Sequence, residues 1–210
     1  MQFKRVLISG EAIVVMVDMC SSSDIFEELI LRNDLSSFDK FITKLKHYLA
    51  RSQEVVLFDP YKFTGDGWIL LFPGNTDGAL LCQFLRGLSE FYRDTSKSIL
   101  LPRLDTRPTV HGLTFGVEKG RVAKMTIFQQ TEYIGRPISV ACRLQAAVKA
   151  TTRNPAYKGL ISAGAFQDCF AHTTNLKGSA RNIPLRNVRG GRAFRCKLVS
   201  FSPNKIAPRH

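Results

Sequence analysis

The sequence predicts an α+β fold in which helices flank a central, mostly antiparallel sheet. Two observations lead to this prediction. Apolar runs of strand character alternate with helical segments in the order β-α-β-β-α-β, and a tight turn joins the two middle strands. The 210 residues, 44% of them hydrophobic, suffice for one sizeable core but are few for two. We therefore expect a single domain over residues 1–210, with its core at about 11–200.

The first strand and the first helix follow one another directly. Residues 12–17 (AIVVMV) are a continuous apolar run, which is typical of a strand that is buried on both faces. The polar stretch 21–24 (SSSD) then predicts the start of a helix. Apolar residues recur at helical spacing from there to about Ala50, so we expect one helix over this whole segment.

A hairpin and a second helix come next. Residues 54–63 and 67–73 have the character of strands. The Gly65-Asp66-Gly67 link between them predicts a tight turn, because glycine tolerates positive φ. Residues 76–94 return to helical spacing, which predicts the second helix.

The second half of the chain predicts another strand pair and a third helix. Residues 109–117 and 120–128 are expected to pair around Glu118-Lys119-Gly120. The third helix is expected to start at Gly135-Arg136-Pro137, where a first helical turn accepts proline, and to end near Lys149. A strand at 159–162, a short helix at 163–170 and a last strand at 193–200 complete the chain. This order indicates a ferredoxin-like sheet with additions.

Composition excludes several classes of protein. The five cysteines lie far apart and include no C-x-x-C pair, which argues against a zinc site and against a disulfide framework. No apolar run approaches the roughly 20 residues that cross a bilayer. We therefore expect a cytoplasmic protein without a membrane segment.

The net charge of +13 is unevenly distributed along the chain. Residues 151–210 hold 11 Lys or Arg and a single acid, Asp168, and so contribute +10. A basic tail of this kind indicates either nucleic-acid binding or a surface that attracts a small polyanion such as a triphosphate. Because no RNA-binding motif and no aromatic-basic repeat accompanies the charge, we favour the small molecule over nucleic acid.

Two aspartates stand where strands end or turn. Asp18 ends the first strand, and Asp66 lies at the tip of the hairpin. If the two strands are neighbours, both carboxylates emerge at the same edge of the sheet. Converging carboxylates without a nearby His or Cys suit Mg2+ or Mn2+, which prefer oxygen ligands. Taken singly, Asp18 could instead cap the following helix, and Asp66 could be an ordinary turn residue.

Five segments, in order from about residue 12 to 199, resemble motifs of the class III nucleotidyl cyclases, the family of adenylate and guanylate cyclases. The resemblance covers nearly the whole chain and implies the class III nucleotidyl cyclase fold. The segments are 17–23 (VDMCSSS) and 62–67 (KFTGDG), which match the two metal motifs, 112–116 (GLTFG) with 120–122 (GRV), which match the central glycine-rich strand pair, 133–144 (YIGRPISVACRL), which matches the transition-state helix, and 185–190 (LRNVRG), which matches the phosphate-binding segment.

The resemblance implies a reaction and an assembly. Asp18, Asp66 and the main-chain carbonyl of Met19 would hold two divalent metal ions, Mn2+ or Mg2+. The ions would promote attack of the ribose 3′-hydroxyl on the α-phosphorus, with pyrophosphate leaving. Arg143 matches the family's transition-state arginine, whose fork suits charge on phosphate oxygens; otherwise it is a surface arginine. Because the family's sites lie between two catalytic domains, a chain with one domain implies a homodimer with two composite sites.

Two positions depart from the family's pattern. Ser139 replaces an Asn that helps to orient the ribose, so the sugar must be placed differently or through water. Arg189 replaces a phosphate-binding Lys, which keeps the charge but changes the donor geometry. The alternative interpretation of Arg189 is one more charge in a basic tail.

Lys62 and Glu132 occupy the two positions that read the base in the family. Adenylate cyclases often have Lys at the first position and Asp or Thr at the second, whereas guanylate cyclases usually have Glu and Cys. Lys62 with Glu132 therefore argues against GTP without securing ATP, because a lysine donor equally suits a pyrimidine carbonyl. Tyr133, beside the pair, is expected either to stack on a base or to fill space.

The bare domain, with no sensor or membrane segment attached, resembles the bacterial pyrimidine cyclases of anti-phage signalling. These enzymes make cyclic UMP or cyclic CMP for a separate effector protein. We therefore expect UTP as the substrate, with CTP next, and a second messenger in antiviral defence. The alternatives are an adenylate cyclase, a degenerate cyclase-fold binding module and a basic nucleic-acid-binding protein. Loss of either metal aspartate would favour the module, and both are present.

Overall fold

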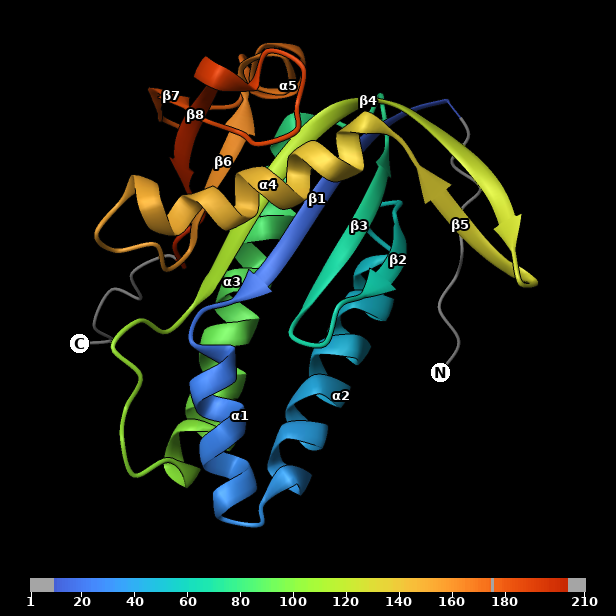
Figure 1. Ribbon diagram of the computed structural model, residues 1–210. Helices are drawn as coiled ribbons and strands as arrows, with labels where there is room; N and C mark the ends of the chain where they lie inside the picture. Colours follow the sequence, from blue (N-terminus) through green and yellow to red (C-terminus); the bar gives the residue numbers. More distant parts are fainter. Residues whose placement is uncertain (1–9, 175, 204–210) are drawn as a thin grey trace.

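A computed structural model describes residues 10–174 and 176–203, which form one eight-stranded sheet flanked by helices (Figure 1). The elements in chain order are β1 (Gly10–Met19), α1 (Ser22–Leu31), α2 (Leu35–Ser52), β2 (Asp59–Phe63), β3 (Gly67–Pro73), α3 (Gly78–Ile99), η1 (Leu101–Arg103), β4 (Leu113–Ile127), β5 (Gln130–Ile134), α4 (Arg136–Thr151), β6 (Lys158–Ser162), α5 (Ala163–Ala165), η2 (Phe166–Phe170), β7 (Gly178–Ile183), η3 (Gly191–Ala193) and β8 (Phe194–Ser200).

The sheet confirms the predicted α+β class. Its strand order is β2-β3-β1-β4-β6-β8-β7, with β5 paired to the far end of β4. Among the described residues, the strand pairings are antiparallel except that of β4 with β6, which is parallel. The first six core elements, with α1 and α2 together acting as one crossover, give the order β2-β3-β1-β4 and so the predicted ferredoxin-like arrangement.

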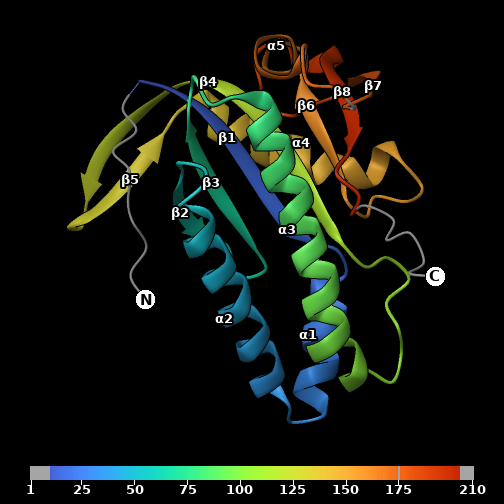
Figure 2. The same cartoon turned by 180° about the vertical axis from the view of Figure 1, so that it is seen from behind.

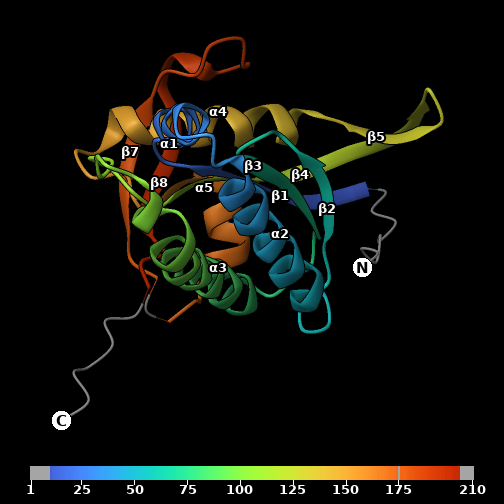
Figure 3. The same ribbon diagram turned by 90° about the horizontal axis from the view of Figure 1, so that it is seen from below.

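The central strand β1 is buried on both faces, as its apolar run predicts. Ile13, Val15 and Val17 belong to the large core beneath α2 and α3, which Figure 2 shows on one side of the sheet. Val14 and Met16 belong to a second core, which includes Ala141 of α4. Figure 3 shows α4 on the opposite side of the sheet from α2 and α3. Side chains alternate along a strand, so even-numbered residues of β1 face α4.

Three predicted elements in the first half differ from the structure. The long first helix is broken into α1 and α2, because Asn33 adopts a positive φ of 55° and Asp34 accepts hydrogen bonds from the hydroxyls of Ser36 and Ser37. The strand predicted at 54–63 begins only at Asp59. The residues before it form hydrogen-bonded turns that follow directly from α2. The strand at 67–73 and the tight turn before it are confirmed. The helix predicted at 76–94 is α3 and continues to Ile99.

The second half contains one clear error of prediction. The strands expected at 109–117 and 120–128 are one continuous strand, β4, which passes straight through Glu118, Lys119 and Gly120. The turn lies at Phe128 and Gln129, both with positive φ, and leads into β5. The long hairpin of β4 and β5 extends beyond the rest of the sheet (Figure 1).

The remaining elements follow the predictions closely. The third helix is α4, with Pro137 in its first turn, and it ends at Thr151. The strands expected at 159–162 and 193–200 are β6 and β8, and the helix at 163–170 is α5 followed by the short π-helix η2. Strand β7 was not predicted, because its exposed residues 179–182 carry no apolar pattern.

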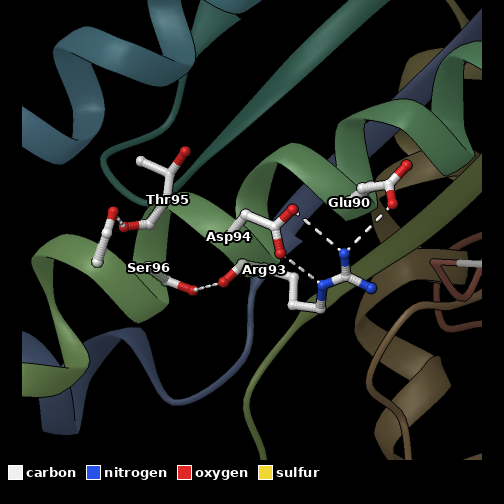
Figure 4. A network of polar contacts seen from close by, with 6 residues as sticks. Glu90, Arg93, Asp94, Thr95 and Ser96 are labelled. Atoms are coloured by element: carbon white, nitrogen blue, oxygen red, sulfur yellow. Dashed lines mark hydrogen bonds and ion pairs between the residues drawn. The ribbon is translucent and has the colours of Figure 1, made fainter. Parts of the chain in front are cut away.

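A small polar network lies along α3 (Figure 4). Arg93 donates from Nε to Asp94 Oδ1 at 2.7 Å and from Nη2 to Glu90 Oε1 at 3.2 Å. The Ser96 hydroxyl donates to the main-chain oxygen of Arg93 at 3.0 Å. All of these contacts join residues of one helix, so they stabilise α3 locally.

Candidate active site

The end of β1 brings the two predicted aspartates together. Asp18 lies opposite Gly67 in the antiparallel pairing of β1 with β3, so Asp66 in the preceding turn falls beside Asp18. A Cβ on Gly67 would lie 2.1 Å from the main-chain oxygen of Val17, so only glycine allows this close approach of the strands. The prediction that both carboxylates emerge at the same edge is confirmed.

The alternative roles, a helix cap for Asp18 and an ordinary turn residue for Asp66, explain fewer of the contacts that these two side chains make. Asp18 is a strand residue, and Ser21 occupies the N-cap position of α1, so Asp18 does not cap this helix. Asp66 does lie in the turn, but its Oδ2 also accepts a 2.5 Å hydrogen bond from the hydroxyl of Ser22 in α1. The side chain of Met19 is fully buried, which leaves only its main-chain carbonyl for metal binding.

The surroundings of Asp18 disfavour its charged form. Burial and the neighbouring Asp66 carboxylate raise the pKa of Asp18 to about 6, against the opposing effects of Lys149 and of a hydrogen bond from Gln145. Gln145 donates from Nε2 to Asp18 Oδ2 at 2.9 Å. Two carboxyl groups held together in a partly buried place repel each other when both are charged, and a bound cation relieves that repulsion.

The donors at this edge fit a hard divalent cation. Burial raises the pKa of the adjacent Cys20 thiol to about 11, so that this side chain stays protonated and is a poor metal ligand. Within residues 10–174 and 176–203, no three His, Cys, Asp or Glu side chains come together as a metal cage. Two carboxylates, a main-chain carbonyl, water and substrate phosphates are the oxygen ligands that Mg2+ typically uses.

Arg143 and Ser139 lie on a different face of α4 from the aspartate pair. Arg143 donates from Nη1 to the main-chain oxygen of Ser139, one turn earlier, at 3.1 Å on the exposed side of the helix. Gln145, two residues on and hence turned by about 200°, points to Asp18. Within one chain, the predicted transition-state residues and the predicted metal residues therefore face in different directions.

The two predicted base-reading residues meet although they are 70 residues apart. Lys62 Nζ lies 3.5 Å from Glu132 Oε2. Glu132 also accepts a hydrogen bond from the hydroxyl of Tyr61, and this bond, with the charge of Lys62, lowers the pKa of Glu132. Tyr133 is buried, and its hydroxyl donates to Asp59 Oδ2 at 3.3 Å, so the space-filling role is the one its position supports.

Arg189 lies in the exposed loop between β7 and η3. The pocket formed by this loop is lined by Arg186 and Arg192. Arg189 itself is exposed beside that pocket, so its position leaves both the phosphate-binding and the surface-charge interpretations open.

Two hollows adjoin the aspartate pair. One, of about 320 Å³, lies between Asp66, Ser22 and the rings of Phe26 and Phe38. The other, of about 440 Å³, is lined by the polar residues 20–24 and by the basic side chains of Lys149 and Arg153, with Val110, Thr152 and Pro155 completing the wall. This basic hollow holds two cationic side chains against one carboxylate, Asp24, so that it is suited to an anion.

Sequence reasoning missed three residues that contact the predicted site. Ser22, Tyr61 and Gln145 hydrogen-bond to Asp66, Glu132 and Asp18. Tyr61 directly precedes Lys62, and Gln145 directly follows the transition-state motif, so both are adjacent in sequence to predicted site residues. Their hydrogen-bond partners could not be predicted, because these depend on which strands and helix faces meet in the fold.

Comparison by sequence finds no matching protein-family model and no matching curated protein. Comparison by structure finds similar chains. The adenylyl cyclase CyaB from P. aeruginosa matches with a TM-score of 0.70 at 15% identity, over 94% of this chain and 97% of that one. The guanylyl cyclase Cya2 matches with a TM-score of 0.62 at 13% identity, over 97% and 98%. An adenylate cyclase from Trypanosoma brucei, solved in its monomeric state, matches with a TM-score of 0.61 at 14% identity, over 94% and 93%. The chain has the class III nucleotidyl cyclase fold.

Proposed function

We propose that this chain is a nucleotidyl cyclase that converts a nucleoside triphosphate to a 3′,5′-cyclic nucleotide and pyrophosphate. The observation that carries the proposal is the meeting of Asp18 and Asp66 at the end of β1, on a fold shared with adenylyl and guanylyl cyclases. Burial and the closeness of the two carboxylates raise the pKa of Asp18, and pKa shifts of this kind are typical of functional sites.

The reaction forms one bond and breaks another. The 3′-oxygen of the ribose attacks the α-phosphorus, the hydroxyl proton leaves to solvent, and the bond to the β-phosphate breaks to release pyrophosphate. Asp18, Asp66 and the carbonyl of Met19 would hold two Mn2+ or Mg2+ ions. When bound, such ions lower the pKa of the hydroxyl and offset charge on the phosphates.

The basic hollow next to Asp18 supports a place for the terminal phosphates. Lys149 and Arg153 of its lining supply two positive charges against the single carboxylate of Asp24, and Ser21, Ser22 and Ser23 supply hydroxyls. Leaving-group charge that develops on pyrophosphate would be stabilised there. This role accounts for part of the basic charge of the chain without invoking nucleic acid.

The orientation of α4 supports a homodimer with composite sites. Because Arg143 and Ser139 face away from the aspartates of their own chain, they would serve the site of a second copy. The β4–β5 hairpin also carries exposed apolar side chains, among them Phe128 at its tip, which is 95% exposed. Apolar surface of this kind is typical of an interface between proteins.

The pair of Lys62 and Glu132 supports recognition of a base that presents one hydrogen-bond acceptor next to one hydrogen-bond donor. The Tyr61 hydrogen bond keeps Glu132 ionised and oriented as an acceptor, while Lys62 donates. We propose UTP, whose O4 and N3–H match this pair, with CTP next. Adenine N1 and the adenine amino group match the same pair, so an adenylate cyclase is the second candidate function.

The proposed product is a second messenger for a separate effector protein, in a cytoplasmic enzyme of antiviral defence. The resemblance to the bacterial pyrimidine cyclases supports this role. No helix in the described part of the chain is long and apolar enough to cross a membrane.

Incubation with each of the four triphosphates and Mn2+ or Mg2+, followed by mass spectrometry, tests the proposal. We expect cyclic UMP as the main product and no product from Asp66→Asn. Cyclic AMP as the main product would establish the second candidate. Absence of any cyclic product from the purified dimer would contradict the cyclase proposal and favour a binding module.

A further inference from the structure

We propose that Gln145 is a positioning residue that orients the metal carboxylate of Asp18, an inference that rests on the proposed function. Gln145 is 7% exposed, and its amide lies over the end of β1. Its role is to hold one carboxylate oxygen, so that the carboxyl group presents a fixed geometry to a cation.

Gln145 bridges two neighbouring strands at the level of the aspartate pair. Asp18 of β1 lies directly opposite Thr114 of β4 in the antiparallel register. Gln145 Nε2 donates to Asp18 Oδ2 at 2.9 Å and to Thr114 Oγ1 at 2.8 Å. The Thr114 hydroxyl lies 3.4 Å from the main-chain oxygen of Asp18. Both N–H groups of the amide therefore have an acceptor, which fixes the rotation of the amide and with it Oδ2 of Asp18.

The packing of α4 on β4 explains how Gln145 reaches this place. Thr114 and Gly116 are on the face of β4 that α4 covers, since side chains alternate along the strand. A Cβ on Gly116 would lie 2.0 Å from the main-chain oxygen of Ala141 and 2.4 Å from the nitrogen of Gln145. The missing side chain lets the helix backbone touch the strand. The Gln145 side chain then extends over Thr114 to Asp18.

The chemistry of an amide suits this position. Asp18 already has Asp66 beside it, so a third carboxylate would add repulsion, whereas a neutral N–H donor does not. Hydrogen bonds that hold a metal-binding side chain from behind typically change metal affinity or activity by about 10- to 100-fold when they are removed. Gln145 makes such a bond without occupying Oδ1.

A metal-binding measurement separates this role from a role in stability. Gln145→Met keeps the length of the side chain and removes both N–H donors. Gln83→Met makes the same change at an exposed position of α3 and serves as the control. The loss of the free Mn2+ signal in electron paramagnetic resonance reports binding by the protein alone, with Asp66→Asn as the variant without the site. Thermal unfolding in EDTA shows that each variant is folded.

We expect Gln145→Met to weaken Mn2+ binding at this site by about 10-fold or more, with Gln83→Met unchanged. Where cyclic nucleotide is formed, the Mn2+ concentration for half-maximal rate rises by a similar factor, and kcat at saturating Mn2+ stays within a few-fold of wild type. If Gln145→Met fails to fold, Thr114→Val serves instead, because it removes the hydroxyl that fixes the amide. Several-fold weaker binding is expected for it, with Thr114→Ser restoring wild-type affinity.

Two results would overturn the inference. The inference is wrong if Gln145→Met binds Mn2+ as tightly as wild type. It is also wrong if Asp66→Asn leaves Mn2+ binding unchanged. The proposed function fails separately, if wild type binds Mn2+ through Asp66 and forms no cyclic nucleotide. In that case weaker binding by Gln145→Met still supports the positioning role.

Discussion

The surroundings of the Asp18 side chain in the folded protein disfavour its charged form. In the unfolded chain an aspartate has a pKa of about 3.9, whereas burial and Asp66 raise the pKa of Asp18 to about 6 in the folded protein. The folded state therefore keeps a proton that the unfolded state has lost. Between about pH 4 and pH 6, stability falls as the pH rises, and above this range the whole loss is present.

Asp18→Asn is expected to stabilise the protein in the absence of metal. Asparagine carries no charge, and its side-chain oxygen still accepts from Gln145. In thermal melts with EDTA, the variant should unfold at a higher temperature than wild type at pH 7.5, and the difference should disappear near pH 4. Added Mn2+ should raise the melting temperature of wild type alone. A difference that is the same at both pH values would contradict this account of Asp18.

Tyr61→Phe is expected to lower catalytic efficiency and to leave stability nearly unchanged. The variant loses the hydrogen bond that orients Glu132 and lowers its pKa. The kcat/KM for UTP should fall by about 10-fold, the size of one hydrogen bond to a charged group. Tyr133→Phe is the contrasting control, because it loses a buried bond to Asp59 and should lower the free energy of unfolding by about 1 kcal/mol without changing kcat/KM for UTP. Equal effects of the two variants on kcat/KM would refute the assignment.

Among the elements, the contact of α4 with β4 depends on one missing side chain. Gly116→Ala would place a Cβ against the backbone of Ala141 and Gln145. We expect a loss of about 3 kcal/mol in the free energy of unfolding, measured with urea, because two backbones would have to separate. Gly164→Ala in α5, where a Cβ meets nothing within 4 Å, is the matched control and should be nearly neutral. A tolerated Gly116→Ala would mean that α4 packs less closely than described.

The sequence predicts most elements because their apolar patterns are strong, and it fails where a polar or glycine residue has two possible roles. Gly120 suggests a turn, but β4 is continuous there, and a Cβ would lie 3.0 Å from Pro137 of α4. Asn33 and Asp34 were ordinary polar residues within a helical pattern, although they end α1 and start α2. Asp18 and Asp66 were predictable because strand ends converge. Gln145 was not, because its partner depends on the position of α4 over the sheet.

At the scale of the whole molecule, the different directions that Arg143 and the two aspartates face predict shared sites. Asp66→Ala would lack the proposed metal site, and Arg143→Ala would lack the proposed transition-state arginine, so each homodimer should be inactive. Mixed dimers should regain about one half of wild-type activity per dimer, since one of their two sites is intact. Tandem purification with two different tags isolates the mixed dimers. Inactivity of verified mixed dimers would show that each chain forms its site alone.

Helix α4 has a further consequence in such a dimer. Its outer face would carry Arg143 to the partner's site, and its inner face holds Asp18 of its own site through Gln145. One rigid helix of 16 residues thus belongs to both sites. A small movement of α4 that tightens Arg143 on a substrate in one site also shifts the amide against Asp18 in the other. The dimer would then respond cooperatively, and the first substrate bound would set the affinity for the second.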